Sequence, residues 1–344
     1  MRASTTALFI LLGVGSLLSG IALILPNVTG AALAQAPPTE LLRLETSIQL
    51  GEVRGRVDHM SIDRGRNRLI VAELENDSVA IVDLNDRKVI HVITGLKEPQ
   101  GVAYVPSTDM LYVANAGDGS LRLFGGGDYA PAGMIELGDD ADNIRLDPRA
   151  NAVFVGYGSG ALAVIDAATQ RKTADMPLGA HPESFQLAAD GGRIYVNLPT
   201  ARAIAVLDAA TRKRVATWPA SVGNGNFAMA LDDAAQRVIV VFRTPARLAA
   251  FSMVDSRLIE MVETCGDADD VFVDAKRQRI YVSCGDGYLD IFDKQNHPYR
   301  RLAHIRTAAG ARTSLFVPEL DRLFVAVRAN AGEPASIRVF QPAP

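Results

Sequence analysis

The chain has 344 residues, of which 48% are hydrophobic and 22% charged, with 29 glycines. This composition is typical of a soluble globular protein with a large core, and the length fits one large domain or two. Because the formal net charge is −4, we expect no nucleic acid as a partner, since phosphate binding needs a basic surface.

The first 36 residues form a separate compositional block. Arg2 is their only charged residue, residues 7–25 are an apolar run, and Ala32 and Ala34 end the block. This pattern predicts a secretory signal peptide over residues 1–34, and therefore a periplasmic or secreted protein. An uncleaved membrane anchor is the alternative, because about 19 apolar residues can span a bilayer. The chain has 35 Lys and Arg residues and 39 Asp and Glu residues, and cleavage removes one of the positive charges, Arg2. We expect no stable membrane anchor after cleavage.

After a short linker over residues 35–40, one pattern repeats seven times. A β-branched and aromatic run recurs every 41 to 44 residues, followed by a turn rich in Gly, Asn and Asp and by another apolar strand. The runs are RLIVAE (68–73), MLYVAN (110–115), AVFVGY (152–157), RIYVNL (193–198), RVIVVF (237–242), RIYVSC (279–284) and RLFVAV (322–327). Four short strands in each repeat of this length predict the blades of a β-propeller. Residues 41–344 are therefore expected to form a single all-β domain, a seven-bladed propeller with four-stranded blades.

The two ends of this domain complement each other. The seventh repeat stops at Pro344 after its third strand, whereas residues 41–51 precede the first repeat. Their last residues, IQLG (48–51), match IELG (135–138) at the end of a fourth strand. We therefore expect the N-terminal strand to complete the C-terminal blade and to close the ring, which covers an open sheet edge.

The second repeat resembles a known family. Residues 98–124, EPQGVAYVPSTDMLYVANAGDGSLRLF, look like the YVTN-repeat β-propellers, and most like their exported, YncE-like bacterial members. The resemblance extends over residues 40–342 and implies a propeller fold and export, although the tetrapeptide Tyr-Val-Thr-Asn itself does not occur. It implies no single reaction, because the repeated residues of that family build blades.

A polar ring is predicted at one mouth of the central channel, where the segments that lead into the innermost strands converge. Aligned by the runs above, the equivalent positions are 58/59, 100/101, 142/143, 183/184, 227/228, 269/270 and 312/313. The candidate ligand-binding residues are Asp58, His59, Gln100, Asp142, Asn143, His181, Glu183, Asn226, Asp269, Asp270 and Arg312. The alternative is a wet mouth that is polar without a ligand, in which Arg312 or Arg145 pairs with the carboxylates.

Three classes of function stay open. A non-catalytic binding or scaffold module for a small polar ligand, a peptide or a protein is favoured, because no established catalytic motif occurs. The second class is a lactonase-like hydrolase with a divalent cation such as Ca²⁺ and with His59 as general base. Its candidate metal ligands are Glu183, Asn143 and Asp270, with Asn226 beside them. The third is an oxidoreductase-associated subunit, which the missing Cys-x-x-Cys-His motif and the single tryptophan, Trp218, disfavour. We expect neither haem nor a nucleotide as a cofactor. We expect the protein to be a monomer.

The chain has only two cysteines, Cys265 and Cys284. Cys265 precedes the first strand of the sixth blade and Cys284 ends its second strand, and these strands are antiparallel neighbours. A disulfide is therefore sterically feasible, and an exported protein favours it. A zinc or copper site that uses both thiolates is the alternative.

Overall fold

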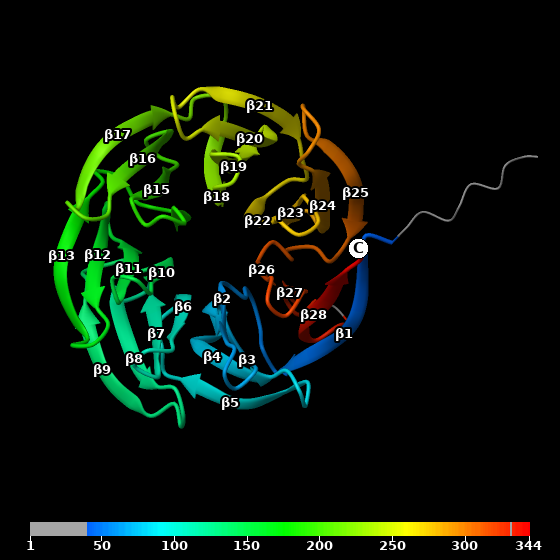
Figure 1. Cartoon of the computed structure of the whole chain (residues 1–344). Helices are drawn as coiled ribbons and strands as arrows, with labels where there is room; N and C mark the ends of the chain where they lie inside the picture. The colour runs from blue at the N-terminus through cyan, green and yellow to red at the C-terminus, as the bar shows by residue number, and fades with distance from the viewer. Residues whose placement is uncertain (1–39, 331) are drawn as a thin grey trace, which may run out of the picture. The chain divides into compact units, whose positions relative to one another are not determined.

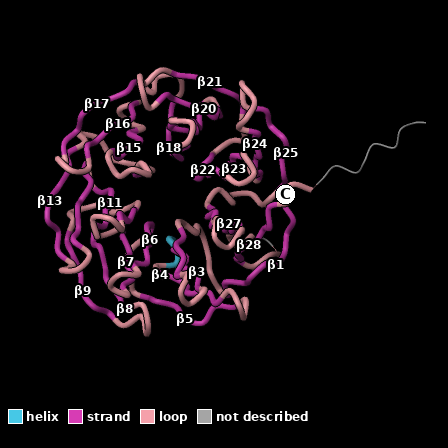
Figure 2. Tube along the Cα trace, in the orientation of Figure 1, coloured by secondary structure: helices cyan, strands magenta, loops and turns pink. Residues whose placement is uncertain are grey.

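A computed structural model describes residues 40–330 and 332–344 of the chain. The predicted signal peptide, residues 1–34, and residues 35–39 of the predicted linker lie outside the described residues. Within the described residues the chain is mostly strand and loop, and the 3-10 helix η1 (Leu74–Asn76) is the one helical element (Figure 2). No helix in this part of the chain has the length and apolar character needed to cross a membrane.

Seven antiparallel four-stranded sheets form a ring (Figure 1). Blade 1 contains β2 (Met60–Asp63), β3 (Arg68–Glu73), β4 (Ser78–Asp83) and β5 (Lys88–Thr94). Blade 2 contains β6 (Pro99–Val105), β7 (Met110–Asn115), β8 (Ser120–Gly125) and β9 (Pro131–Glu136). Blade 3 contains β10 (Ile144–Asp147), β11 (Ala152–Tyr157), β12 (Ala161–Asp166) and β13 (Arg171–Pro177). Blades 4 and 5 contain β14 (Phe185–Leu187), β15 (Arg193–Leu198), β16 (Ala203–Asp208) and β17 (Lys213–Pro219), and β18 (Asn224–Asp232), β19 (Arg237–Thr244), β20 (Ala246–Ser252) and β21 (Leu258–Glu263). Blade 6 contains β22 (Ala268–Asp274), β23 (Arg279–Cys284), β24 (Tyr288–Asp293) and β25 (Arg300–Arg306). The predicted seven-bladed β-propeller is confirmed.

Blade 7 joins the two ends of the chain, as the sequence predicts. It contains β26 (Ser314–Val317), β27 (Arg322–Val327), β28 (Ala335–Pro342) and, as its outer strand, β1 (Leu42–Gly51). Ile48 lies opposite Ile337 in the antiparallel ladder, and the side chains of Leu42, Ile48 and Leu50 are buried. The N-terminal strand therefore closes the ring with backbone hydrogen bonds and with apolar packing.

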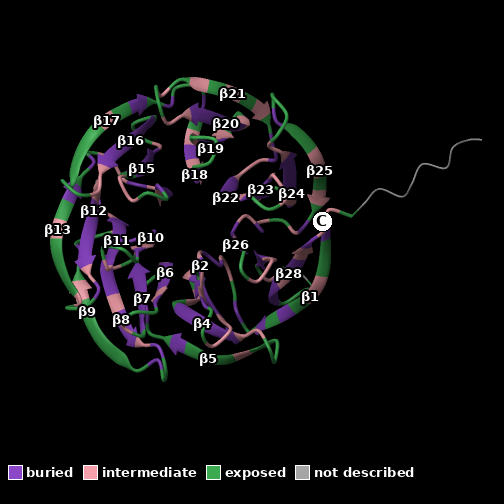
Figure 3. Ribbon diagram, in the orientation of Figure 1, coloured by how far each residue is buried: buried purple, intermediate pink, exposed green. Residues whose placement is uncertain are grey.

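The hydrophobic core lies between neighbouring blades. All six residues of β7 are buried, whereas β9, the outer strand of the same blade, has no fully buried residue. Figure 3 shows the same trend around the ring, with buried residues inside and exposed residues along the outer strands. A strand that is covered on both faces requires a continuous apolar run, which explains the β-branched and aromatic runs that repeat in the sequence.

Tight turns join the inner strand and the second strand in each blade. In six blades the residue directly before the second strand has a left-handed backbone with φ between 49° and 54°; these residues are Asn67, Asp109, Asn151, Gln236, Gln278 and Asp321. Asn and Asp adopt this conformation more readily than most residues that carry a side chain. The turns give six blades the same pairing of the first two strands and so bring the opposite ends of the inner strands to equivalent places.

Candidate functional site at the channel mouth

The polar residues before the inner strands occupy equivalent places at one end of the channel, which we call the mouth. In blade 1 the Asp58 N–H donates to the Ala72 carbonyl (2.7 Å), and the Ala72 N–H donates to the His59 carbonyl (3.0 Å). The same two bonds, at 2.9 to 3.0 Å, join Asp142 and Asn143 to Gly156 and join Glu183 and Ser184 to Asn197. The alignment of the repeats therefore corresponds to equivalence in space.

In blades 2, 5 and 6 the inner strand is irregular at this same place. The register with the second strand shifts between Pro99 and Val102, between Asn226 and Met229, and between Ala268 and Asp270. A bulge of this kind bends a strand and redirects its side chains. At the rim of the mouth, the side chains are therefore not bound to the strict alternation of a flat strand.

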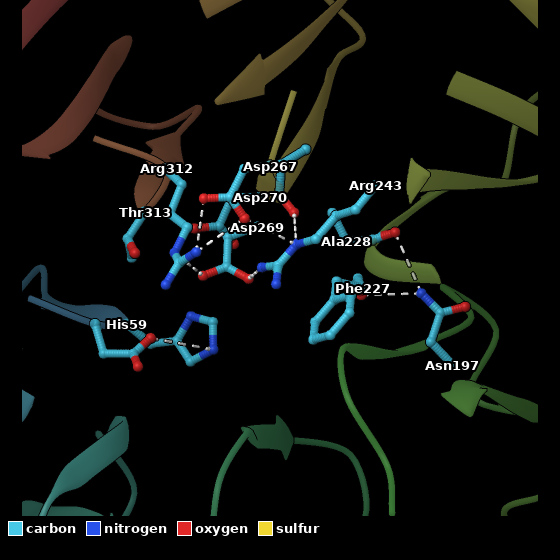
Figure 4. Close-up of polar contacts among 12 residues, drawn as sticks. His59, Asn197, Phe227, Ala228, Arg243, Asp267, Asp269, Asp270, Arg312 and Thr313 are labelled. Carbon is cyan, nitrogen blue, oxygen red and sulfur yellow. Dashed lines mark hydrogen bonds and ion pairs between the residues drawn. The ribbon is translucent and has the colours of Figure 1, made fainter. Parts of the chain in front are cut away.

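Asp269 lies between arginine side chains (Figure 4). Arg243 Nη2 lies 2.6 Å from Asp269 Oδ1, and Arg312 Nε lies 3.4 Å from Asp269 Oδ2. Arg312 also donates to Asp267 at 2.7 Å, and the Arg243 guanidinium lies 3.7 Å from the centre of the Phe227 ring. These pairs compensate the charge of Asp269, whose side chain is only 9% exposed, because a buried carboxylate is stable only when it is paired.

His59 lies between two buried carboxylates. Its Nε2 is 3.8 Å from Asp58 Oδ1 and 3.9 Å from Asp142 Oδ1. Arg56 Nη2 lies 2.7 Å from Asp58 Oδ2, and the Asn143 amide donates to Asp142 Oδ2 at 3.2 Å. The imidazole is therefore well placed to carry a positive charge, which both carboxylates stabilise.

The pKa values of His59 and of the carboxyl groups Asp142, Glu183 and Asp270 at the mouth are all raised. Burial raises the pKa of Asp142 to about 7 and that of Glu183 to about 7, and the neighbouring carboxylates add to both shifts. Burial also raises the pKa of Asp270 to about 6. Burial opposes protonation of His59, but the surrounding carboxylates outweigh it and raise the pKa of this imidazole. The mouth therefore holds protons near neutral pH, where a bound ligand can change its charge.

Glu183 and Asp270 keep free acceptor capacity. Glu183 is half-buried. In the described part of the chain its carboxylate makes no hydrogen bond and no ion pair within 4.0 Å. Asp270 Oδ2 accepts one hydrogen bond, from the Ser314 N–H at 2.8 Å. These two carboxylates can therefore still accept hydrogen bonds from a ligand.

Three of the predicted residues lie apart from this arrangement. His181 Nδ1 is 2.7 Å from the Gly158 carbonyl and 3.4 Å from Asp140 Oδ2, at the edge of the mouth. Gln100 is half-buried in the irregular part of β6. Asn226 is fully buried and donates to Asn197 Oδ1 at 3.2 Å, so it joins blade 5 to blade 4. The other eight predicted residues, Asp58, His59, Asp142, Asn143, Glu183, Asp269, Asp270 and Arg312, surround the mouth.

Sequence reasoning missed Arg56, Asp267 and Arg243 as parts of this cluster. Arg56 is two residues before Asp58 and Asp267 is two residues before Asp269, so a wider window around the aligned positions includes both. Arg243 gives no such signal, because it lies near the end of β19, a second strand that is longer than its equivalents. Only the tertiary structure places its guanidinium against Asp269.

A cavity of about 380 Å³ lies in the channel and reaches the mouth residues His59 and Asp270. The inner strands of all seven blades line it. Most of the lining is apolar, as the sequence predicts below the polar ring, and includes Met60, Val102, Ile144, Met229 and Val271. The mouth and this cavity together have the size and mixed character of a small-molecule site.

Among the described residues, the carboxylates and histidines of the mouth form no compact set of three possible metal ligands. In the described residues, only Cys265, Cys284 and Asp286 bring three possible His, Cys, Asp or Glu ligand atoms within 4.8 Å of one another. At the mouth no such set forms, and arginine side chains are interleaved with the carboxylates. A Ca²⁺ ion needs several converging oxygen atoms, and the positive charge of these arginines opposes its binding.

Cys265 and Cys284 form a disulfide, with their Cα atoms 5.8 Å apart. This confirms the predicted bond across the start of blade 6. The bond uses both sulfur atoms, so the alternative interpretation as a zinc or copper site with two thiolates is wrong.

Comparisons with known proteins bear on the fold. No protein-family model and no curated protein sequence matches the chain. Among solved structures, hydrazine synthase of Kuenenia stuttgartiensis is similar with a TM-score of 0.73 and 16% identity, over 86% of this chain and 99% of that chain. A chain of a mitotic checkpoint complex is similar with a TM-score of 0.75 and 11% identity, over 94% of this chain and 99% of that chain. At these identities the likeness shows the shared β-propeller fold.

Proposed function

We propose that this propeller is an exported binding module whose ligand site is the channel mouth. The observation that carries the proposal is the group of interacting charges at the mouth, where His59 acts electrostatically on both Glu183 and Asp270, beside a cavity of about 380 Å³ that His59 and Asp270 line. The apolar N-terminal block supports export. The disulfide is compatible with an oxidising compartment.

The charges of the mouth indicate the chemistry of the ligand. Asp267 and Asp269 are compensated by Arg243 and Arg312. Glu183 and Asp270 keep free acceptor capacity, and Asp58 Oδ1 and Asp142 Oδ1 also accept no hydrogen bond within the described residues. A ligand with an ammonium or hydroxyl group would supply the missing donors. We therefore propose a small polar ligand that donates hydrogen bonds to this side of the mouth.

A lactonase-like hydrolase has less support. Arg56, Arg243 and Arg312 lie among the carboxylates of the mouth, and their positive charge opposes cation binding there. Asn226 joins two blades instead. An oxidoreductase-associated role has no observation in its favour, since the likeness to hydrazine synthase at 16% identity concerns the fold.

Thermal shift and calorimetry with monosaccharides, primary amines and α-amino acids test the binding proposal. A ligand that binds the folded state raises the melting temperature. Glu183→Gln removes the free carboxylate with little change in volume, and we expect it to weaken binding of the best compound at least tenfold, about 1.4 kcal/mol. Glu136→Gln, on the exposed end of outer strand β9, is the matched control. The proposal fails if no compound stabilises the protein or if both variants bind it equally.

A further inference from the structure

Below the mouth, the inner strands contribute one layer of equivalent residues to the cavity. Each of these residues lies opposite the third residue of the repeated apolar run in its own blade. The layer consists of Ser61, Ala103, Arg145, Gln186, Ala230, Phe272 and Leu315, and all seven line the cavity. Four of them are apolar, two are neutral and polar, and Arg145 is the only ion.

Arg145 has no ionic partner in the described residues. Its Nη1 donates to the Ile144 carbonyl at 2.8 Å, and its Nε donates weakly to Gln186 Oε1 at 3.4 Å. The guanidinium lies 5.6 Å from the centre of the Phe185 ring. Among residues 40–330 and 332–344, no carboxylate oxygen lies within 4.0 Å of it. Arg145 therefore retains donor capacity on the side that faces the cavity.

The arginines of the mouth differ from Arg145 in this respect. Arg56, Arg243 and Arg312 each have a carboxylate oxygen within 2.6 to 2.7 Å. Arg145 is half-buried, and a cation that loses part of its hydration without gaining an ionic partner destabilises the folded protein. Burial accordingly lowers the pKa of Arg145, and the more distant carboxylates Asp270 and Asp142 offset this only in part. Packing of the propeller does not explain the residue, since six blades have neutral side chains at the same place.

We infer that Arg145 is an anion subsite and that the ligand of the channel is a small zwitterion of the amino-acid type. This inference rests on the proposed function, because it assigns the amine of the ligand to the free carboxylates at the mouth. The carboxylate of the ligand pairs with the Arg145 guanidinium, which suits planar anions. Its apolar body lies against the apolar part of the same cavity, where Ala103 and Ala230 leave room.

The test compares one ligand skeleton with and without each charged group. The twenty standard α-amino acids are screened by thermal shift with the full mature chain. The strongest binder is then compared by calorimetry with the amine that lacks its carboxylate and with the acid that lacks its amine. We expect the amino acid to bind at least tenfold more tightly than either analogue, because only it pairs with both charged sides of the cavity.

Variants of Arg145 separate a binding role from a structural one. Arg145→Met should weaken the amino acid and the acid at least tenfold, leave the amine unchanged, and not lower the melting temperature of the ligand-free protein. Arg145→Lys keeps the charge and should restore part of the loss. Arg149→Met, at an arginine outside the channel whose side chain is 46% exposed, is the control and should bind like the parent protein.

The outcomes distinguish the two proposals. If the amine binds as tightly as the amino acid, or if Arg145→Met leaves every affinity unchanged, the anion subsite is wrong while the mouth remains a binding site. If no amino acid binds but a monosaccharide does, the zwitterion is wrong and the proposed function stands. If no compound of either panel binds, both proposals fail.

Discussion

Replacing Asp142 by Asn should stabilise the protein by an amount that grows as the pH rises. The Asp142 side chain is only 6% exposed, and burial raises its pKa from 3.8 to about 7. A carboxyl group with a raised pKa favours folding while it is protonated. Its favourable contribution is complete below pH 3.8 and is lost as the pH rises through about 7. Asn cannot ionise, so the variant avoids this loss.

The size of the effect follows from the displacement of the pKa. One pKa unit corresponds to about 1.4 kcal/mol. At pH 5, which lies above the unfolded pKa of 3.8, Asp142→Asn should stabilise the protein by roughly 2 kcal/mol. At pH 8, which lies above the folded pKa of about 7, it should stabilise the protein by about 4 kcal/mol. The variant should also lower the pKa of His59, because Asp142 is one of the carboxylates that raise it.

Urea unfolding at pH 5 and at pH 8 measures the difference, with the fluorescence of Trp218, the single tryptophan, as the probe. An NMR titration of His59 gives the second measurement. Asp139→Asn, at an exposed residue three positions earlier, is the control and should change neither. Equal stabilisation by Asp142→Asn at both pH values, or destabilisation at pH 8, would refute the assignment of a strained, buried carboxyl at this site.

Three further changes test the ring and the charge cluster. Reduction of the bond between Cys265 and Cys284, which are 19 residues apart, should lower the free energy of unfolding by about 3 kcal/mol; urea curves with and without reductant measure this, and identical curves would show that the bond constrains nothing. Ile48→Ala on β1 should cost about 2–5 kcal/mol because Ile48 is 2% exposed, and a thermal shift below about 2 °C would contradict a packed closure. Arg243→Met leaves Asp269 with a poorer partner and should cost about 3 kcal/mol, whereas Arg243→Lys, which keeps the charge, should cost less; equal losses in urea unfolding would show that packing rather than charge is responsible.

The fold was predictable because propeller packing leaves a repeated record in the sequence. A second strand that is buried on both faces needs an apolar run, and seven such runs occur at nearly constant spacing. The closing strand was predictable for a related reason, since IQLG (48–51) has the pattern of a fourth strand. The disulfide followed from the neighbouring positions of two antiparallel strands in one blade. Each of these features depends on contacts within one blade or between adjacent blades.

The candidate site was predictable only in part. Alignment of the repeats identified the positions around the mouth, because equivalent positions in a closed ring face the same axis. It did not show that Asn226 joins two blades or that Arg243 pairs with Asp269, because a bulge and a longer strand redirect these side chains. Pairing, burial and pKa depend on distances across the ring between residues far apart in the chain. The sequence alone therefore determined the architecture and the polar positions, whereas only the tertiary structure decided which carboxylates are compensated and that Arg145 has no ionic partner in the part of the chain that the structure describes.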